Sequence, residues 1–477
     1  MTLIDNNFQS RRTFLRRSGR LALAGGALPF ALNLAAMGEA AAFDATDYKA
    51  LVCLFMHGGN DYANTVVTYD TDSYNKYSAA RPGISLGRAA LGATLLNPAS
   101  ALPNGRQYAL HPSMTGLANL FNTGQAAVQL NVGPLVAPTT RAGYDSNDRK
   151  ANPLPPSLFS HNDQQSIWQS SSPEGSTVGW GGNLGDLAQA SNSASLFTCI
   201  SVSGNAVFLS GDTALQYQIG TDAAVKINSV SDAVYGSSAV RDAMRTLAQS
   251  SSTQVLENEY NTVTRRAISA EGLMSNGLNA NPATNAPFSG FSRDNPLAAQ
   301  LRMVARIIAS RGTLGAKRQV FMVSMGGFDA HDNLLGSHNG LLAGVSNALT
   351  EFHTATRALG IAEKVTAFTA SDFGRTLASN GDGSDHGWGS HHFVVGGAVR
   401  GKSFYGTAPP VSLGNTAAAD DQWHVGQGRL LPSTSVDQYA ATLAKWFGVA
   451  DSEFSGIVPN IGRFGGAGYL VNLGFMS

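Results

Sequence analysis

The chain has 477 residues, with 32 Lys and Arg against 32 Asp and Glu, so its formal net charge is zero. Nucleic acids and anionic membranes are bound through clusters of Lys and Arg, and the absence of such a cluster after the first twenty residues argues against both. Only 13% of the residues are charged, about half the usual share, while 53 are glycine, which favours a loop-rich exported protein with an ample core.

Residues 1–42 have the features of an export signal. Arg11 and Arg12 precede Thr-Phe-Leu, which is the twin-arginine pattern. The apolar run 21–36 is too short to span a bilayer, so we expect no stable membrane span. Ala40 and Ala42 predict cleavage before Phe43, and therefore export by the twin-arginine translocase to the periplasm or the medium. An uncleaved N-terminal anchor is the alternative.

The mature part, residues 43–477, has 27 basic and 30 acidic residues after five arginines and two acids are removed with the signal. Short apolar runs alternate with amphipathic helical patterns, which predicts an α/β fold with one mostly parallel central sheet and helices on both faces. The expected strands are 51–56, 126–132, 319–325, 365–370 and 393–395, and the expected helices are 112–123, 296–312, 341–360 and 436–447.

Two segments rich in Ser, Asn, Gly and Pro, 170–177 and 272–295, are expected to be surface loops within a single large domain. Cys53 lies in the first apolar run, and Cys199 is the other cysteine. Because twin-arginine substrates fold in the reducing cytoplasm, we expect two free thiols, with a disulfide as the alternative.

Acids and histidines gather in two segments that each follow a predicted strand. Asp329 and His331 follow the strand 319–325, and Asp385 and His386 lie between the last two strands. The carboxyl ends of parallel strands are where α/β proteins build their sites, and imidazole with carboxylate suits Zn²⁺, Mn²⁺ or a related divalent ion. Polar loop residues that only bond the backbone are the alternative reading.

An early candidate follows the first strand, in the sequence His57-Gly-Gly-Asn-Asp61. The two glycines allow a tight turn and close approach to a ligand, which makes Asp61 a candidate metal ligand. A glycine turn in which Asp61 only satisfies backbone groups is the alternative. His57 is interpreted as a half-buried histidine.

These motifs together resemble the exported bacterial family called domain of unknown function 1501. The resemblance covers nearly all of the mature chain and rests on Gly58–Asp61, Ser160-His161 with Gln164 and Trp168, Phe328–His331, Ser371–Thr376, Asp385–Gly389 and Gly426–Leu430. That family is similar to the alkaline phosphatase and sulfatase superfamily. The resemblance therefore implies an alkaline phosphatase-like fold with one or two metals at the strand ends.

Carried over residue by residue, the resemblance implies metal ligands at Asp61, Asp329, His331 and His392. In the superfamily an aspartate at the place of Asp372 is commonly followed by histidine, but Phe373 follows it here. The pair Asp385 and His386 is a second way to supply those ligands. Asp372, Asp385 and His386 therefore all stay in the candidate set.

The superfamily's enzymes form a covalent intermediate, and neither cysteine has a sulfatase-like setting here. Ser160 is the candidate nucleophile, since it could begin a helix whose N–H groups favour an anionic ester. An ordinary helix N-cap is the alternative for Ser160. His161 could be a ligand or a base, and Arg141 or Arg375 could bind an anion.

Two functions follow from these candidates. The first is a periplasmic metal-dependent hydrolase acting on a small phosphate or sulfate ester. The second is a non-catalytic envelope binding or assembly protein that keeps the hydrolase-like fold, since fold does not dictate function.

Overall fold

One mixed sheet organises the chain, which is described here from a computed structural model covering residues 45–466 and 468–477. The expected signal, residues 1–42, lies outside the described residues. The sheet has nine strands in the order β10-β4-β9-β8-β1-β7-β5-β6, with β11 paired to β4. Only the pairs that β9 makes with β4 and β8 are antiparallel. The strands are β1 (Lys49–Met56), β4 (Ala126–Gly133), β5 (Cys199–Ser201), β6 (Gln216–Gln218), β7 (Arg318–Met325), β8 (Val365–Ser371), β9 (Ser390–Gly396), β10 (Phe404–Tyr405) and β11 (Thr434–Ser435).

Strand β1 lies at the centre of the sheet because both of its faces are apolar. Ala50, Val52 and Leu54 join the core on one side, whereas Cys53 and Phe55 join the core on the other side. This alternation follows from the two-residue period of a strand. Such a strand must be covered on both faces, as parallel sheets usually are.

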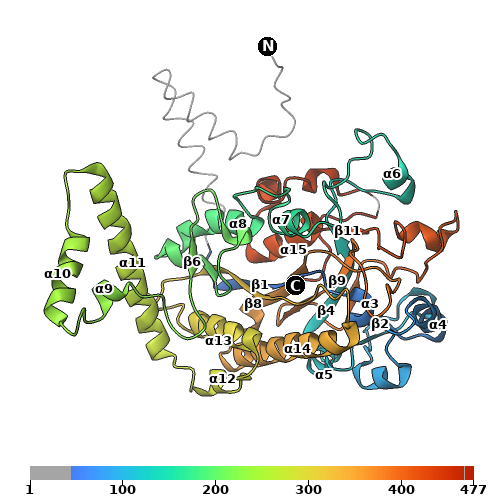
Figure 1. The fold of residues 1–477 in the computed structure, drawn as a ribbon, viewed down its shortest axis with the longest axis horizontal. Helices are drawn as coiled ribbons and strands as arrows, with labels where there is room; N and C mark the ends of the chain where they lie inside the picture. The colour runs from blue at the N-terminus through green and yellow to red at the C-terminus, as the bar shows by residue number, and fades with distance from the viewer. Residues whose placement is uncertain (1–44, 467) are drawn as a thin grey trace, which may run out of the picture.

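Helices cover both faces (Figure 1). One layer contains α5 (Thr115–Asn122), α12 (Ala286–Ser289), α13 (Pro296–Ala309) and α14 (Leu334–Ala358). The other layer contains α7 (His161–Ser170), α8 (Trp180–Ala188), α15 (Val436–Phe447) and α16 (Phe454–Ile457). The structure is therefore a single α/β domain with a mostly parallel sheet, as the sequence predicts.

Smaller elements lie at the two ends of the sheet. At one end, the antiparallel pair β2 (Val66–Thr68) and β3 (Tyr108–Leu110) accompanies α3 (Tyr62–Thr65) and α4 (Thr71–Ala80), and the short α6 (Arg141–Asp145) lies on a loop. At the other end, α9 (Asn228–Ser231), α10 (Ser238–Gln249) and α11 (Val255–Ala280) project away from the sheet (Figure 1). We call residues 225–273 the arm.

All five predicted strands are confirmed, and the helices expected at 112–123, 296–312 and 436–447 correspond to α5, α13 and α15. The expected loop at 272–295 is wrong, because α11 continues to Ala280 and α12 follows. The Gly, Ser and Asn residues of this segment lower its intrinsic helix propensity. The burial of Met274 and Leu278 in the core stabilises the helix and outweighs that low propensity. Helix α14 likewise begins at Leu334 rather than near residue 341.

Both cysteines are buried free thiols, as expected for core residues. Within the described residues, no helix has the length and apolar character needed to cross a bilayer.

Candidate metal centre

The turn after β1 brings two later segments of the chain together. Gly58 and Gly59 have φ values of 113° and 82°, which favour glycine. A Cβ on Gly58 would lie 2.4 Å from the backbone N of Asp329, and a Cβ on Gly59 would lie 2.4 Å from the ring of Phe373. The absence of both side chains therefore lets the segments after β7 and β8 meet beside β1.

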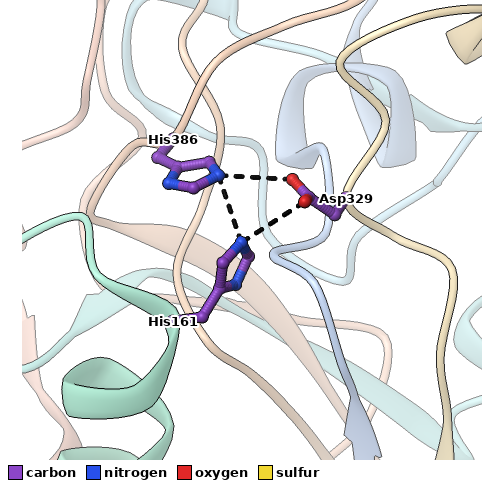
Figure 2. A group of neighbouring side chains, drawn as sticks. All are labelled: His161, Asp329 and His386. Atoms are coloured by element: carbon purple, nitrogen blue, oxygen red, sulfur yellow. Dashed lines mark hydrogen bonds and ion pairs between the residues drawn. The ribbon is translucent and has the colours of Figure 1, made fainter.

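Four side chains converge at this edge of the sheet. His161 comes from the first residue of α7, Asp329 and His331 come from the loop after β7, and His386 comes from the loop between β8 and β9. His386 Nε2 lies 3.1 Å from His161 Nε2 and 2.9 Å from His331 Nε2. Figure 2 shows the part of this cluster formed by His161, Asp329 and His386, whose ligand atoms all lie within 4.8 Å of one another.

The outer nitrogen of each ring is already bonded to an acceptor, which determines where its proton lies. His161 Nδ1 is 2.6 Å from Asp372 Oδ2, and His386 Nδ1 is 2.7 Å from the carbonyl oxygen of Phe159. His331 Nδ1 is 3.3 Å from Asp385 Oδ1. Because each Nδ1 must donate, each neutral ring has its lone pair on Nε2. Three lone pairs therefore point toward the same small space.

Facing lone pairs repel unless a proton or a metal ion lies between them. Asp329 adds its carboxylate to the same space, with oxygens 3.3 Å from His386 Nε2 and 3.4 Å from His161 Nε2. Two ligands held about 2.1 Å from one ion at tetrahedral or octahedral angles lie about 3.0–3.4 Å apart. The separations among His161, His386 and Asp329 fit this spacing, so these three form a suitable donor set for a divalent ion, and His331 lies beside His386 and Asp329 as a further donor.

The charge state of the cluster depends on its neighbours. The hydrogen bond to Asp372 raises the pKa of His161, whereas burial lowers the pKa of His386. Burial works to raise the pKa of Asp329, but the hydrogen bond and the charge of Arg375 outweigh it and lower that pKa. Asp329 is therefore an ionised carboxylate, as a metal ligand must be.

Asp372 lies behind His161 rather than in the cluster. It is fully buried, and its Oδ2 also accepts a hydrogen bond from Gln165 Nε2 at 2.7 Å. Its Oδ1 is buried and has no partner. A carboxylate that holds the far nitrogen of a ligating histidine fixes the orientation of the ring. In this position Asp372 can orient the ring of His161.

Asp385 has the same relation to His331, although it is more exposed. Its Oδ1 accepts hydrogen bonds from His331 and from Asn380 Nδ2. The sequence left open whether Asp372 or Asp385 is the ligand. The structure places each of them behind a histidine.

Asp61 is the clearest departure from the ligand set that the resemblance implies. It caps α3 through the backbone N–H of Asn64 and forms a buried ion pair with Arg81. Ser384 Oγ donates to Oδ2, the same oxygen that pairs with Arg81, while the Asn64 N–H bonds Oδ1. Burial opposes ionisation of Asp61, but the charge of Arg81 outweighs burial and lowers its pKa. These bonds occupy both carboxylate oxygens, so we leave Asp61 out of the ligand set.

His392 also lies outside the cluster. Its ring is buried against Trp168, with ring centres 4.7 Å apart, and its Nδ1 is 3.3 Å from Thr369 Oγ1. Burial lowers its pKa to about 3, so it is a neutral core residue. It lies on β9, among the apolar side chains under α7 and α15.

Ser160 directly precedes the cluster residue His161. It occupies the N-cap position of α7, but its side chain makes no capping hydrogen bond. The N-cap alternative therefore describes its place in the backbone and not the use of its hydroxyl. Ser160 is half-buried, and the preceding Phe159 holds His386 through its carbonyl group.

The two arginines considered for anion binding are engaged elsewhere. Arg375 is fully buried and donates to Asp329 Oδ1 at 2.5 Å and to the carbonyl of Ser384. Arg141 bonds Asp145 and the carbonyl of His424. Arg375 is therefore a positioning residue for Asp329.

The sequence singled out three of the four converging side chains. It raised His161 only as a ligand or base, because a histidine at a helix start after a loop gives no spacing signal relative to distant residues. The available signal was the Ser160-His161 motif at the start of a helical pattern.

The family comparison covers most of the chain. A family model described as "Protein of unknown function (DUF1501)" matches residues 48–451. No curated protein matches the chain. One similar solved structure comes from work on the metabolism of multiple glycosaminoglycans by Bacteroides thetaiotaomicron. It has 9% sequence identity and a TM-score of 0.35, covering 85% of this chain and 74% of that chain.

Proposed function

The chain belongs to the DUF1501 family of proteins of unknown function, and from the geometry of the cluster we propose that it is an exported, metal-dependent hydrolase of small phosphate or sulfate esters. The observation that supports this most directly is the convergence of three imidazole nitrogens and one carboxylate with their lone pairs inward. Such an arrangement stabilises a divalent ion, with zinc and manganese as the first candidates.

The proposed ligands are His161, His331, His386 and Asp329. A divalent ion held there would polarise an ester oxygen and make a bound nucleophile more acidic. The protein's own part is to orient the ligands. Asp372 keeps the proton of His161 on Nδ1, and the Phe159 carbonyl does the same for His386. Arg375 holds Asp329 through Oδ1, the oxygen that also lies nearest His331 and His386.

We propose Ser160 as the nucleophile. Its hydroxyl is free of the capping bond and is carried on the residue next to a ligand. In the first step the serine oxygen would bond to phosphorus or sulfur as the bond to the leaving alcohol breaks, and the serine proton would end on that alcohol. Water would then release phosphate or sulfate and restore the hydroxyl. The first N–H groups of α7 would favour the anionic group.

The alternative is a non-catalytic protein of the cell envelope that binds a metal or assembles with a partner. The observation in its favour is that Arg375 and Arg141 are both bonded to other groups, so neither offers a free guanidinium to an anionic ester. A structural ion would then join the loops without turnover.

Export remains part of the proposal. The twin-arginine pattern lies at residues 11–15, so the expected partner during export is the twin-arginine translocase, and the expected location is the periplasm or the medium. The test compares the location of two proteins in the cell, the first with its native leader and the second with Arg11 and Arg12 both replaced by Lys. Export of the first protein only is the predicted result.

The function is tested by measuring metal content and turnover on the same preparations. We expect about one divalent ion per chain, and hydrolysis of aryl phosphates or aryl sulfates that His386→Ala abolishes together with metal binding. Ser160→Ala should keep the metal but lose about two or more orders of magnitude in kcat. A protein without turnover on either ester class would favour the non-catalytic alternative, and a protein that is also metal-free would contradict the metal-dependent hydrolase.

A further inference from the structure

Exposed apolar side chains are concentrated on the arm. Of the fifteen large apolar side chains that are exposed in the described part of the chain, eleven lie within residues 225–273. The most exposed on its two longer helices are Leu256 at 86%, Val255 at 81%, Leu247 at 70% and Tyr260 at 69%. Soluble proteins rarely leave such patches uncovered, so the arm has the character of an interaction surface.

The apolar residues of α11 form a continuous stripe along one face. Leu256, Tyr260, Val263 and Ala267 are spaced by four, three and four residues, and all four are exposed. This is the spacing of the buried seam in a two-stranded coiled coil. On the adjoining side of the same helix, Thr264 and Ile268 are buried within the chain.

Two opposite charges flank the stripe on the same side. Glu259 and Arg266 are seven residues apart, so they lie two helical turns from each other on one edge of the stripe. Within the described residues, no ion pair engages either side chain. Each therefore has its charge available to a partner.

The charge of the arm distinguishes between possible partners. Residues 225–273 hold five basic and five acidic side chains. Helices that lie on anionic membranes are rich in Lys and Arg, so a balanced arm does not fit such a surface. A surface with a positive and a negative charge beside an apolar stripe can instead be complementary to a second copy of itself.

We propose that the chain forms a two-fold symmetric dimer in which α11 of one copy packs antiparallel against α11 of the other, through the stripe Leu256, Tyr260, Val263 and Ala267. A two-fold axis close to residue 262 places Tyr260 of each copy against Val263 of the other. The same axis places Glu259 opposite Arg266 of the other copy, twice per dimer. The interface is isologous, so one surface supplies both halves.

Antiparallel packing follows from the charges. In a parallel pair a flanking residue of this kind faces the residue five positions later in the other copy, so Glu259 would face the uncharged Thr264 and only Arg266 would meet an acid, Glu271. Only the antiparallel direction places both Glu259 and Arg266 opposite a residue of the other sign.

The dimer is tested first by sedimentation of the mature protein at micromolar concentrations. We expect a monomer–dimer equilibrium whose dissociation constant rises at least about tenfold in Val263→Asp, because a charge would be buried in the seam. Leu470→Asp, at a residue that is 63% exposed far along the chain, is the matched control and should leave the equilibrium unchanged. A wild-type protein that stays monomeric, or that binds lipid vesicles as a monomer, would overturn the proposal.

Charge reversal tests the proposed pairs. Glu259→Arg and Arg266→Glu should each weaken the dimer, since each creates two like-charged contacts. The double variant should restore the wild-type dissociation constant to within about threefold, because the pairs are re-formed with opposite polarity. Failure of the double variant to recover would contradict this register.

Cross-linking tests the direction of packing. A short thiol-specific reagent should join Val263→Cys into dimers, because residue 263 lies next to the axis. It should not join Val255→Cys, whose two copies would be separated by about 21 Å along the helices at 1.5 Å per residue. The wild type serves as the blank because Cys53 and Cys199 are buried. Equal cross-linking of both variants would indicate parallel packing and overturn the proposal.

Discussion

The hydrogen bond between His161 Nδ1 and Asp372 Oδ2 determines which nitrogen of His161 faces the cluster. Replacing Asp372 by Asn removes the carboxylate while keeping the volume of the side chain. We predict that Asp372→Asn lowers metal affinity about 10- to 100-fold, which is the usual cost of losing an orienting partner of a ligand. The affinity can be measured by competition with a chelating dye.

The control for this prediction is Asp332→Asn. Asp332 is exposed and adjacent to His331, so its replacement changes the same formal charge near the site without touching a ligand. We expect its metal affinity to equal that of the wild type. Equal losses in both variants would mean that the net charge of the loop, rather than the orientation of His161, controls binding.

Asp437 gives a pH-dependent prediction away from the metal cluster. It lies in the first turn of α15, and burial raises its pKa from 3.8 to about 7, although the Asn460 N–H and Ser171 hydroxyl bond it. Between these two values the folded chain holds a proton there that the unfolded chain has lost. The free energy of unfolding contributed by Asp437 therefore falls as the pH rises through this window and is constant above it.

Asp437→Asn should remove that dependence while keeping an acceptor for Asn460 N. We predict that the free energy of unfolding of the variant rises relative to that of the wild type between pH 4 and pH 7. The rise is at most about 4 kcal/mol, because each unit of pKa shift corresponds to about 1.4 kcal/mol. Urea unfolding at several pH values measures this difference. A difference that stays constant with pH would show that Asp437 titrates normally.

At the scale of single residues, the sequence predicts ligand types better than ligand roles. Asp329, His331 and His386 stood out because they follow strands in segments rich in acids and histidines. The same pattern could not show that Asp385 bonds His331 behind the cluster. It also could not show that Asp61 is paired with Arg81. Those roles depend on which side chains meet across distances of tens to hundreds of residues.

At the scale of elements, the turn after β1 controls the approach of the other loops. Gly58→Ala would place a methyl group against the backbone of Asp329 at a φ of 113°. We predict a loss of more than about 2 kcal/mol in the free energy of unfolding, since both strain and overlap oppose the native turn. Metal affinity should fall with it, because Asp329 must shift.

The matched control is Gly272→Ala in α11, where no atom lies within 4 Å of the added methyl group. Alanine is favoured over glycine in a helix by about 1 kcal/mol, so this variant should be equal to or more stable than the wild type. Thermal and denaturant unfolding compare the two. A mild effect at Gly58 would mean that the turn and the loop after β7 adjust easily.

Elements with strong local signals were predictable, whereas those that depend on packing were not. The strands β1, β7 and β8 are near-continuous apolar runs, and α13 has both a capping Asn295 and a proline at its start. The end of α11 lacks such signals, and its helix depends instead on the packing of Met274 and Leu278 in the core. The short strands β10 and β11 are likewise set by their pairing with β4.

At the scale of the whole molecule, the proposed ion would connect three distant parts of the chain. His161 precedes Asp329 by 168 positions in the sequence, and His386 lies on a third segment. We predict that removing the ion with a chelator lowers the unfolding temperature by several degrees. Binding stabilises the folded state by about 2.7 kcal/mol when the free ion is a hundredfold above its dissociation constant.

Specificity of this effect is tested with His386→Ala. The variant should unfold at the same temperature with and without the chelator, and added zinc or manganese should restore the wild type only. A chelator effect that persists in His386→Ala would locate the stabilising ion elsewhere.

The overall architecture was predictable because alternating strands and helices allow few arrangements other than a covered parallel sheet. The arm was not predicted, since its helices are amphipathic without a core to join and their exposed stripe resembles an ordinary buried face. The sequence predicted that acids and histidines would converge at the strand ends. Which of them meet could be known only from the order of the strands, because that order places β7 and β8 on either side of β1.

The most direct test of the metal centre is anomalous X-ray diffraction from crystals of the mature protein grown with zinc or manganese. We predict one strong peak about 2.0–2.3 Å from Nε2 of His161, His331 and His386 and from an oxygen of Asp329. No peak at this position in metal-saturated crystals, or a peak held by other residues, would contradict the account.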